Sequence, residues 1–197
     1  CLILVTPDSE RTMCTFLGTA GKINQNDIDE NAIKESEIIF LEGYLWDEGE
    51  PKRAFDKAIG SASKVAMSLS DKFCVDRHKN HFLELVKNRL NITFANEEEM
   101  TSLINTKKFE DVVTFGKEIQ KLLVITRGDK GAISIFKDQV TEVAVEKNLK
   151  IKDLTGAGDL FAAGFLDGYL RNLSQKECLL KGTEMASKII QIIGARL

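Results

Sequence analysis

The stretch from Lys152 to Phe165 combines residue types that could bind and transfer an anionic group. Gly156, Ala157 and Gly158 form a run of small residues, which lets the backbone approach a ligand closely without a side-chain clash. This run leads into a helical pattern, so its amide N–H groups would lie at a helix N-terminus, where unpaired donors and the helix dipole favour an anion. Asp159 would then stand at the mouth of that anion site.

A simpler interpretation of Asp159 is that it only caps the helix. Aspartate is a favoured N-cap residue, and glycines are common in tight turns. A cap, however, requires neither a Gly-Ala-Gly run nor the upstream Asp153 and Thr155. We therefore interpret the whole segment as a candidate anion-binding site, with Asp159 at its mouth.

Three other segments carry candidate binding residues. Asn96 and Glu99 have capping-box spacing, and on spacing alone a plain helix cap is the favoured interpretation. A turn containing Thr126, Gly128 and Gly131 follows a buried apolar strand, and alone it is a common type of turn. Gly194 and Ala195 lie near the C-terminal end of the sequence.

Apolar strand patterns alternate with helical patterns along most of the chain. Strands are expected at residues 2–5, 38–41, 65–69, 92–95 and 122–126. Helices are expected at 51–63, at 78–90, after residue 96, at 111–120, from about residue 159 and from residue 174. This alternation predicts βαβ units and a mainly parallel, buried sheet. Residues 132–136 and 140–143 break the rhythm and predict an antiparallel hairpin at one edge of the sheet.

Bulk composition is that of a soluble globular protein. The chain has 197 residues, of which 43% are hydrophobic and 29% charged. Its net charge of -3 gives no reason to expect nucleic acid or an acidic membrane as a partner. No apolar run approaches the roughly 20 residues that span a bilayer. The chain begins with cysteine and not methionine, and we expect a fragment of a longer protein, truncated at both ends.

Cysteine and histidine usage points away from metal and redox chemistry. The four cysteines are scattered and form no CxxC pair, which favours a reduced, cytoplasmic setting. His78 and His81 form an HxxH pair with no third ligand nearby, inside a helical pattern, so metal binding is not expected there.

Residues Asp153 to Phe165 resemble the C-terminal signature of the ribokinase (PfkB) family, usually written D-T-T-G-A-G-D. The sequence departs from it at Leu154, where a small or hydroxylic residue is common. The other segments resemble further motifs of the family: Asn96 to Glu99 its N-x-x-E, Thr126 to Gly131 its T-x-G-x-x-G, and Gly194-Ala195 its Gly-Ala near the adenine pocket. The segments 7–18, 42–47 and 68–71 look like its adenosine-kinase-like branch.

The resemblance implies a three-layer α/β/α fold with a mainly parallel central sheet, plus part of a small β lid. Residues 1–197 would form a single α/β kinase domain, with residues 1–17 including a lid strand that returns to the core. A homodimer of the full-length protein is consistent with a family that often dimerises through its lid. The expected partner is a small-molecule sugar or nucleoside.

The resemblance also assigns roles to residues. Asp159 would be the general base, and Gly156, Ala157 and Gly158 the anion hole. Nucleotide (ATP) binding would involve Asn96, Glu99, Thr126, Gly128, Gly131, Gly194 and Ala195. Asn96 and Glu99 would hold Mg²⁺ through water, and Asp153 and Thr155 would form a candidate site for a monovalent cation such as K⁺.

These roles predict an ATP-dependent phosphotransferase acting on a hydroxymethyl group of an adenosine-like nucleoside. One alternative is a kinase of a free sugar or sugar acid, of the ribokinase, fructokinase or 2-keto-3-deoxygluconate kinase type. Another is a non-catalytic member that binds a nucleotide or sugar, against which the aspartate at position 159 argues. A Rossmann dehydrogenase is disfavoured because no glycine fingerprint follows the first strand.

Overall fold

The computed structural model describes residues 1–47 and 49–197. These residues form two compact units. The first unit contains residues 1–16, 126–134 and 140–197, and the second contains residues 17–125 and 135–139. A single domain over residues 1–197 stays a prediction.

The strands form two sheets. A two-stranded sheet consists of β1 (Leu2–Val5) and β2 (Arg11–Cys14), which pair antiparallel. A six-stranded sheet has the order β3-β4-β5-β6-β7-β8. Its strands are β3 (Ile39–Glu42), β4 (Val65–Ser68), β5 (Ile92–Asn96), β6 (Leu122–Thr126), β7 (Ala132–Phe136) and β8 (Gln139–Val143).

Parallel pairing of β3 with β4 and of β4 with β5 confirms the predicted α/β class. The five strands expected from apolar runs are present within one or two residues of their expected bounds, and β7 and β8 lie at one edge as predicted. Because β3, β4 and β5 are parallel neighbours, their carboxyl ends meet at one edge of the sheet, which is where ligands of open α/β sheets bind.

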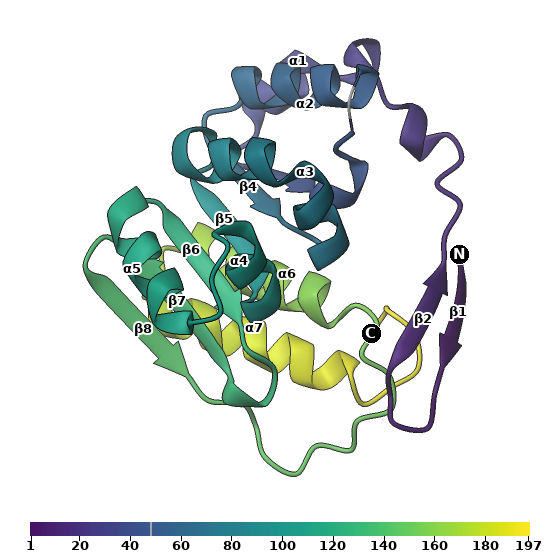
Figure 1. Ribbon diagram of the computed structural model, residues 1–197, viewed down its shortest axis with the longest axis vertical. Helices are drawn as coiled ribbons and strands as arrows, with labels where there is room; N and C mark the ends of the chain where they lie inside the picture. The colour runs from purple at the N-terminus through teal and green to yellow at the C-terminus, as the bar shows by residue number, and fades with distance from the viewer. Residues whose placement is uncertain (48) are drawn as a thin grey trace. The chain divides into compact units, whose positions relative to one another are not determined.

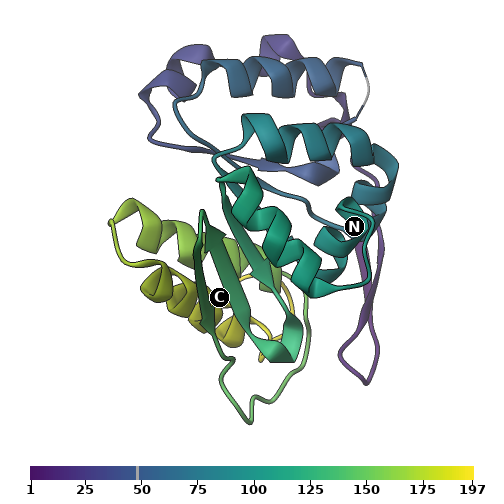
Figure 2. The ribbon, with the colours of Figure 1, turned by 60° about the vertical axis from the view of Figure 1, so that its left-hand side comes forward.

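The second unit carries most of the helices. Helices α1 and α2 lie side by side in both views, coloured purple and blue (Figure 1, Figure 2). Its helices are η1 (Ala20–Lys22), η2 (Gln25–Asp27), α1 (Glu30–Glu35), η3 (Gly43–Leu45), α2 (Glu50–Ser61), α3 (Lys72–Glu84), the π-helix η4 (Leu85–Arg89), α4 (Glu97–Leu103) and α5 (Phe109–Ile119).

Helix α2 shows how local sequence sets these elements. Pro51 stands in its first turn, where the missing N–H of proline is not needed. Ala54, Phe55, Ala58 and Ile59 recur at helical spacing and are buried, which gives the helix its apolar face.

Helix α3 corrects the expected bounds of 78–90, because it begins at Lys72. The carboxylate of Asp71 accepts a hydrogen bond from the Phe73 amide at 2.6 Å and caps the helix six residues before the expected start. The apolar spacing in the sequence indicated only the later turns of this helix.

His78 in α3 has non-helical angles (φ −118°, ψ 23°) and bends the helix. The rings of His78 and His81 pack on Trp46, with centroids 4.5 and 4.9 Å away, so the HxxH pair contributes to an aromatic cluster.

The first unit contains the β1–β2 hairpin, η5 (Gly128–Lys130) and the two C-terminal helices. Every residue of both hairpin strands is exposed. Helices α6 (Ala157–Leu170) and α7 (Gln175–Ile189) lie side by side (Figure 1). Gly164 of α6 lies directly against the backbone carbonyl of Lys181, where an added Cβ would be only 2.6 Å from that oxygen. Within residues 1–47 and 49–197, no helix combines the length and apolarity needed to cross a membrane.

Candidate active site

The N-terminus of α6 carries the predicted anion hole. The helix begins at Ala157, two residues before the expected start, and its N-cap is Gly156 in the left-handed region (φ +79°). Asp159 lies inside the first turn and makes no capping bond, so the interpretation of Asp159 as the N-cap is wrong. Its exposed carboxylate is thus presented at the positive end of the helix.

The amides of this turn are suited to a phosphate oxygen. The first helical bond runs from the Leu160 amide to the Gly156 carbonyl at 2.9 Å. The Ala157 amide donates to the Leu154 carbonyl at 3.3 Å, a long bond that an incoming anion could replace. The Gly158 amide belongs to the same first turn, and the first amides of a helix have no carbonyl partner within the helix itself.

Gly156 is required at its position. An added Cβ would lie 2.9 Å from the Cβ of Ala195, and its φ is unfavourable for any L side chain. Ala195 therefore supports the loop from behind, and the Gly194 amide donates to Asp153 Oδ2 at 2.9 Å. The predicted Gly-Ala pair therefore contacts the loop of the predicted anion hole, and its role toward a nucleotide stays a prediction.

Asp153 organises the same loop. Its carboxylate is 2% exposed and accepts from the Thr155 amide at 2.9 Å and the Thr155 hydroxyl at 2.6 Å. Those bonds and the Gly194 amide hold the pKa of Asp153 below its usual range, with the Thr155 hydroxyl contributing most. Three donors therefore already occupy the carboxylate that would face a monovalent cation, and cation binding stays a prediction.

A cavity of about 770 Å³ adjoins this turn, within the first unit. It brings together Thr126, Gly128 and Gly131 of the predicted nucleotide turn with Ala157 and Gly158 of the predicted anion hole. The two motifs are separated by about 30 positions in sequence, and the structure places both on one cavity. An apolar cavity that adjoins a helix N-terminus is suited to a ligand with an apolar part and an anionic group.

The turn at Gly131 has a backbone that only glycine fits. Gly131 has φ +95°, and an added Cβ would lie 2.0 Å from the Val143 carbonyl oxygen. The Arg127 amide donates to the Gly131 carbonyl at 2.8 Å and closes the turn. The close approach to β8 keeps this turn at the edge of the cavity.

Much of the cavity wall was not predicted from the sequence. Outside the predicted motifs, the wall is built from the first residue of β7, the loop before α6, α6 itself and the C-terminal part of α7 with its cap. The apolar residues of this part are Ala132, Val145, Leu149, Ile151, Leu154, Phe161, Ala186 and Ile190. The loop of residues 144–152 has no regular secondary structure and no motif that marks it. The apolar stripe of α7 was visible in the sequence, but stripes of this kind usually pack in a core.

Asn96 and Glu99 form a reciprocal cap in the second unit. The Glu99 amide donates to Asn96 Oδ1 at 2.7 Å, and the Asn96 amide donates to Glu99 Oε2 at 3.0 Å. Glu99 is only 4% exposed, and burial raises its pKa to about 7, with a further contribution from the nearby acids Asp71, Glu98 and Glu42. The spacing thus does produce a helix cap, while water-mediated Mg²⁺ binding stays a prediction.

The raised pKa of Glu99 predicts a pH-dependent stability. The folded state keeps a proton on Glu99 up to about pH 7, whereas the unfolded chain releases it near the ordinary value of 4.5. The unfolding free energy should therefore fall as the pH rises through this window, by at most about 1.4 kcal/mol per pH unit. In Glu99→Gln this fall should disappear. The difference in unfolding free energy between the variant and the wild type should therefore be roughly 1–3 kcal/mol more favourable to the variant at pH 8 than at pH 5.5.

Urea unfolding of both proteins without Mg²⁺, between pH 5.5 and pH 8, measures this difference. Glu118→Gln is the matched control, because Glu118 is an exposed carboxylate on α5 and is not among the acids that raise the pKa of Glu99. The control should follow the wild-type pH profile. Parallel profiles for Glu99→Gln and the wild type would contradict the prediction.

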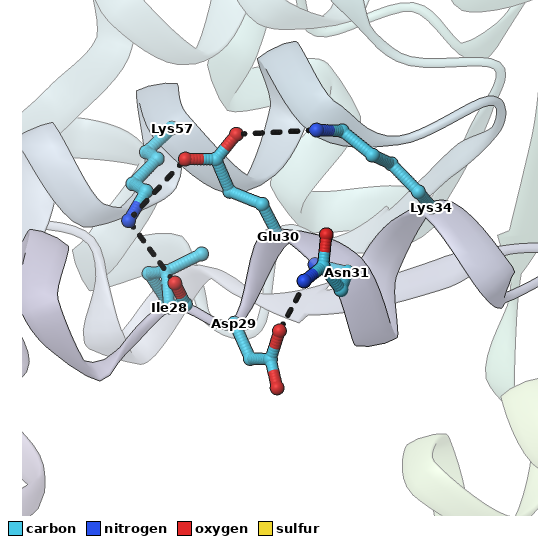
Figure 3. A pocket seen from close by; sticks show the side chains of 6 residues that line it. All are labelled: Ile28, Asp29, Glu30, Asn31, Lys34 and Lys57. Carbon is cyan, nitrogen blue, oxygen red and sulfur yellow. Dashed lines mark hydrogen bonds and ion pairs between the residues drawn. The ribbon is translucent and has the colours of Figure 1, made fainter.

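A second hollow, of about 320 Å³, lies on the second unit around α1 (Figure 3). Three of its four charged side chains pair with one another: Lys57 Nζ lies 3.5 Å and Lys34 Nζ 3.6 Å from the Glu30 carboxylate. Lys57 also donates to the Ile28 carbonyl at 3.1 Å. These bonds join α1 to α2, so we assign this hollow a structural role.

Comparison with known proteins identifies the family. The model of the pfkB family of carbohydrate kinases matches residues 1–197, and the chain therefore belongs to that family. Its structure is similar to that of an adenosine kinase from Sinorhizobium meliloti, with a TM-score of 0.95 and 36% identity, over 99% of this chain and 61% of that one. The fold is ribokinase-like, as the sequence predicts. A ribokinase II from E. coli in complex with ATP and Mg²⁺ shares that fold, with a TM-score of 0.86 at 17% identity over 98% of this chain and 65% of that one.

Curated relatives are similar over part of their length. A nucleoside kinase from Methanocaldococcus jannaschii is 32% identical over 118 residues, which are 60% of this chain and 38% of that protein. A cytidine kinase from Thermococcus kodakarensis is 33% identical over 117 residues, which are 57% of this chain and 41% of that protein.

Proposed function

We propose that the protein transfers the γ-phosphoryl group of ATP to a hydroxymethyl group of a nucleoside, with Asp159 as the general base. The observation that carries this proposal is the turn at the start of α6, where the exposed Asp159 follows two residues, Ala157 and Gly158, that line the large apolar cavity. A nucleotide base would fill that cavity, and its phosphates would reach the amides of the first turn.

Phosphoryl transfer depends on positioning and on charge stabilisation. The amides of residues 156–158 would bind oxygens of the transferred group, where negative charge is shared in the transition state. Asp159 would hold the acceptor hydroxyl in line and take its proton as the oxygen–phosphorus bond forms and ADP leaves. Because the hydroxyl proton moves late in a loose transition state, orientation by Asp159 matters more than its basicity.

Mg²⁺ bound with ATP would neutralise part of the charge on the phosphates. Asn96 and Glu99 remain the candidate residues that would order the water ligands of this ion. Asp153 and Thr155 remain the candidate residues for K⁺. A homodimer and a cytoplasmic setting are further proposals for the whole protein.

A nucleoside is the acceptor that we favour, and adenosine in particular. The 42–47 and 68–71 segments resemble the adenosine-kinase-like branch, and proteins named nucleoside, cytidine and adenosine kinase are among the similar ones. A 2-dehydro-3-deoxygluconokinase from Haemophilus influenzae is also 41% identical, but over only 75 residues, or 37% of this chain and 24% of that protein. This keeps a sugar or sugar-acid acceptor as the second candidate.

An acceptor panel with the full-length protein tests this proposal. ATP and Mg²⁺ would be combined with adenosine, cytidine, ribose, fructose or 2-keto-3-deoxygluconate, and ADP release would be measured. The highest kcat/KM is expected with adenosine. A higher kcat/KM with a sugar would replace the acceptor and keep the mechanism, whereas no turnover with any acceptor would favour the non-catalytic binding protein.

A further inference from the structure

Two residues that carry hydroxyl groups line the large cavity of the first unit from one side of α7. Thr183 and Ser187 are four positions apart, so they lie on one face of this helix. Ser187 is only 5% exposed. The charged residues of the wall, Asp129, Glu146 and Lys147, are all exposed at the protein surface. The face of α7 therefore adds polar groups of no fixed charge to a wall that is mainly apolar.

The hydroxyl group of Thr183 has no hydrogen-bond partner. In the part of the chain that the structure describes, Thr183 Oγ1 and Thr93 Oγ1 are the buried side-chain atoms without one. A threonine hydroxyl in a helix can bond to the carbonyl four residues before it, as Thr114 does to Glu110 at 3.0 Å in α5. An unpaired buried hydroxyl costs folding free energy, so its presence calls for an explanation. Thr183 differs from Thr93 in that it lines a cavity large enough for a ligand.

The packing of α7 against α6 fixes the place of Thr183. At the preceding residue, Gly182, an added Cβ would lie 2.8 Å from the Phe161 carbonyl oxygen, so the two helices touch through their backbones there. Thr183 keeps some exposed surface although its hydroxyl is buried. Threonine in a helix has two favoured χ1 rotamers, and rotation between them moves the hydroxyl to a new direction. A ligand in the cavity can therefore take this hydroxyl as a partner while the backbone stays in place.

A hydroxyl group suits the polar edge of either purine base. It can both donate and accept a hydrogen bond, and it rotates to match its partner. Adenine presents an amino donor where guanine presents an oxo acceptor. A fixed donor or a fixed acceptor would match one of these two groups and leave the other unpaired, whereas a hydroxyl serves both.

We propose that Thr183, with Ser187 beside it, binds the polar edge of the donor base, so that the protein uses ATP and GTP alike as phosphate donors. The proposal rests on the proposed kinase function, in which the base of the nucleotide fills this cavity. The unpaired hydroxyl of Thr183 is the observation that carries it, because a bound purine base gives that hydroxyl the partner that it lacks within the protein.

Isothermal titration calorimetry of the full-length protein with ADP and with GDP, in the presence of Mg²⁺, tests the proposal without catalysis. The Kd values of the wild type for the two nucleotides should agree within about tenfold, the effect of one hydrogen bond. Thr183→Val keeps the shape of the side chain and removes the hydroxyl, so it should weaken both nucleotides by about 3- to 10-fold. Thr183→Ser keeps the hydroxyl and should recover most of this loss.

Thermal unfolding without nucleotide distinguishes a ligand-binding hydroxyl from a structural one. Because Thr183 Oγ1 has no partner in the protein, Thr183→Val should raise the unfolding temperature by about 1–3 °C. A lowered unfolding temperature would show that the hydroxyl stabilises the fold, and it would overturn the proposal. Thr93→Val is the matched control, since it removes the unpaired buried hydroxyl of β5, in the second unit and outside the cavity. The control should leave both Kd values unchanged.

The outcomes separate this proposal from the proposed function. Unchanged Kd values in Thr183→Val, an equal loss in Thr93→Val, or a wild-type preference of more than about tenfold for one nucleotide would each overturn the proposal. Weaker binding of both nucleotides to Thr183→Val, in a protein that transfers no phosphate to any acceptor, would uphold the base assignment and overturn the proposed function. Phosphate transfer to adenosine with unchanged Kd values in Thr183→Val would do the reverse.

Discussion

Asp159→Asn should lower the kcat of the full-length protein by about 10²- to 10⁴-fold, the usual contribution of a general acid or base. Asparagine keeps the size of the side chain but cannot accept the hydroxyl proton. Because Asp159 makes no capping bond, the substitution should not loosen α6. The KM for ATP should stay within about threefold of the wild-type value, since the cavity and the backbone amides are unchanged.

Initial rates of ADP release with saturating adenosine measure this effect, with thermal unfolding as a check that the variant is folded. Asp138→Asn is the matched control, because Asp138 is exposed in the turn between β7 and β8, where asparagine is also favoured. The control should keep the wild-type rate. If Asp159→Asn also kept that rate, the assignment of Asp159 as the base would be wrong.

Gly156→Ala should have the second largest effect. Its φ of +79° is unfavourable for alanine, and the added Cβ would approach the Cβ of Ala195 to 2.9 Å. The backbone should therefore shift and displace the amides of the anion hole. We expect kcat to fall about 10²-fold, together with a loss of about 1–2 kcal/mol in unfolding free energy.

Two further variants separate the steric cause from a general effect of glycine replacement. Gly60→Ala adds a Cβ on α2 with no atom within 4 Å, and it should leave kcat unchanged and stabilise the protein by up to about 1 kcal/mol. Ala195→Gly in the Gly156→Ala background removes the closest atom and should restore part of the rate. A wild-type kcat in Gly156→Ala would show that this backbone does not shape the site.

The strands were predictable because each is an uninterrupted apolar run. Residues 122–126 are an example, since four of the five are buried and the bounds match. The helix starts were less predictable, because a cap and not an apolar residue sets them. Asp71 starts α3 early, and Gly156 in a left-handed conformation starts α6 before Asp159. The start of α6 matters for function, because a helix that began near Asp159 would make this residue a candidate N-cap, whereas in the structure it lies inside the first turn.

The candidate site was predictable where its residues lie in contiguous motifs. Ala157 and Gly158 share a cavity with Thr126 and Gly131, as the motifs require. Contacts between distant segments were not predictable, because no local pattern encodes them. The support of Gly156 by Ala195 and the bond from Ser9 to Ile151 both join segments that are far apart in the chain.

A crystal structure of the full-length protein with ADP, Mg²⁺, aluminium fluoride and adenosine is the most direct test of the account. The fluoride mimics the transferred phosphoryl group, and we predict it within hydrogen-bonding distance of the amides of residues 156–158. The 5′-hydroxyl of adenosine should lie against the Asp159 carboxylate, with the base of ADP in the cavity beside Thr126 and Gly131. A fluoride bound elsewhere, or a nucleotide outside this cavity, would contradict the assignment of the α6 turn as the phosphoryl-transfer site.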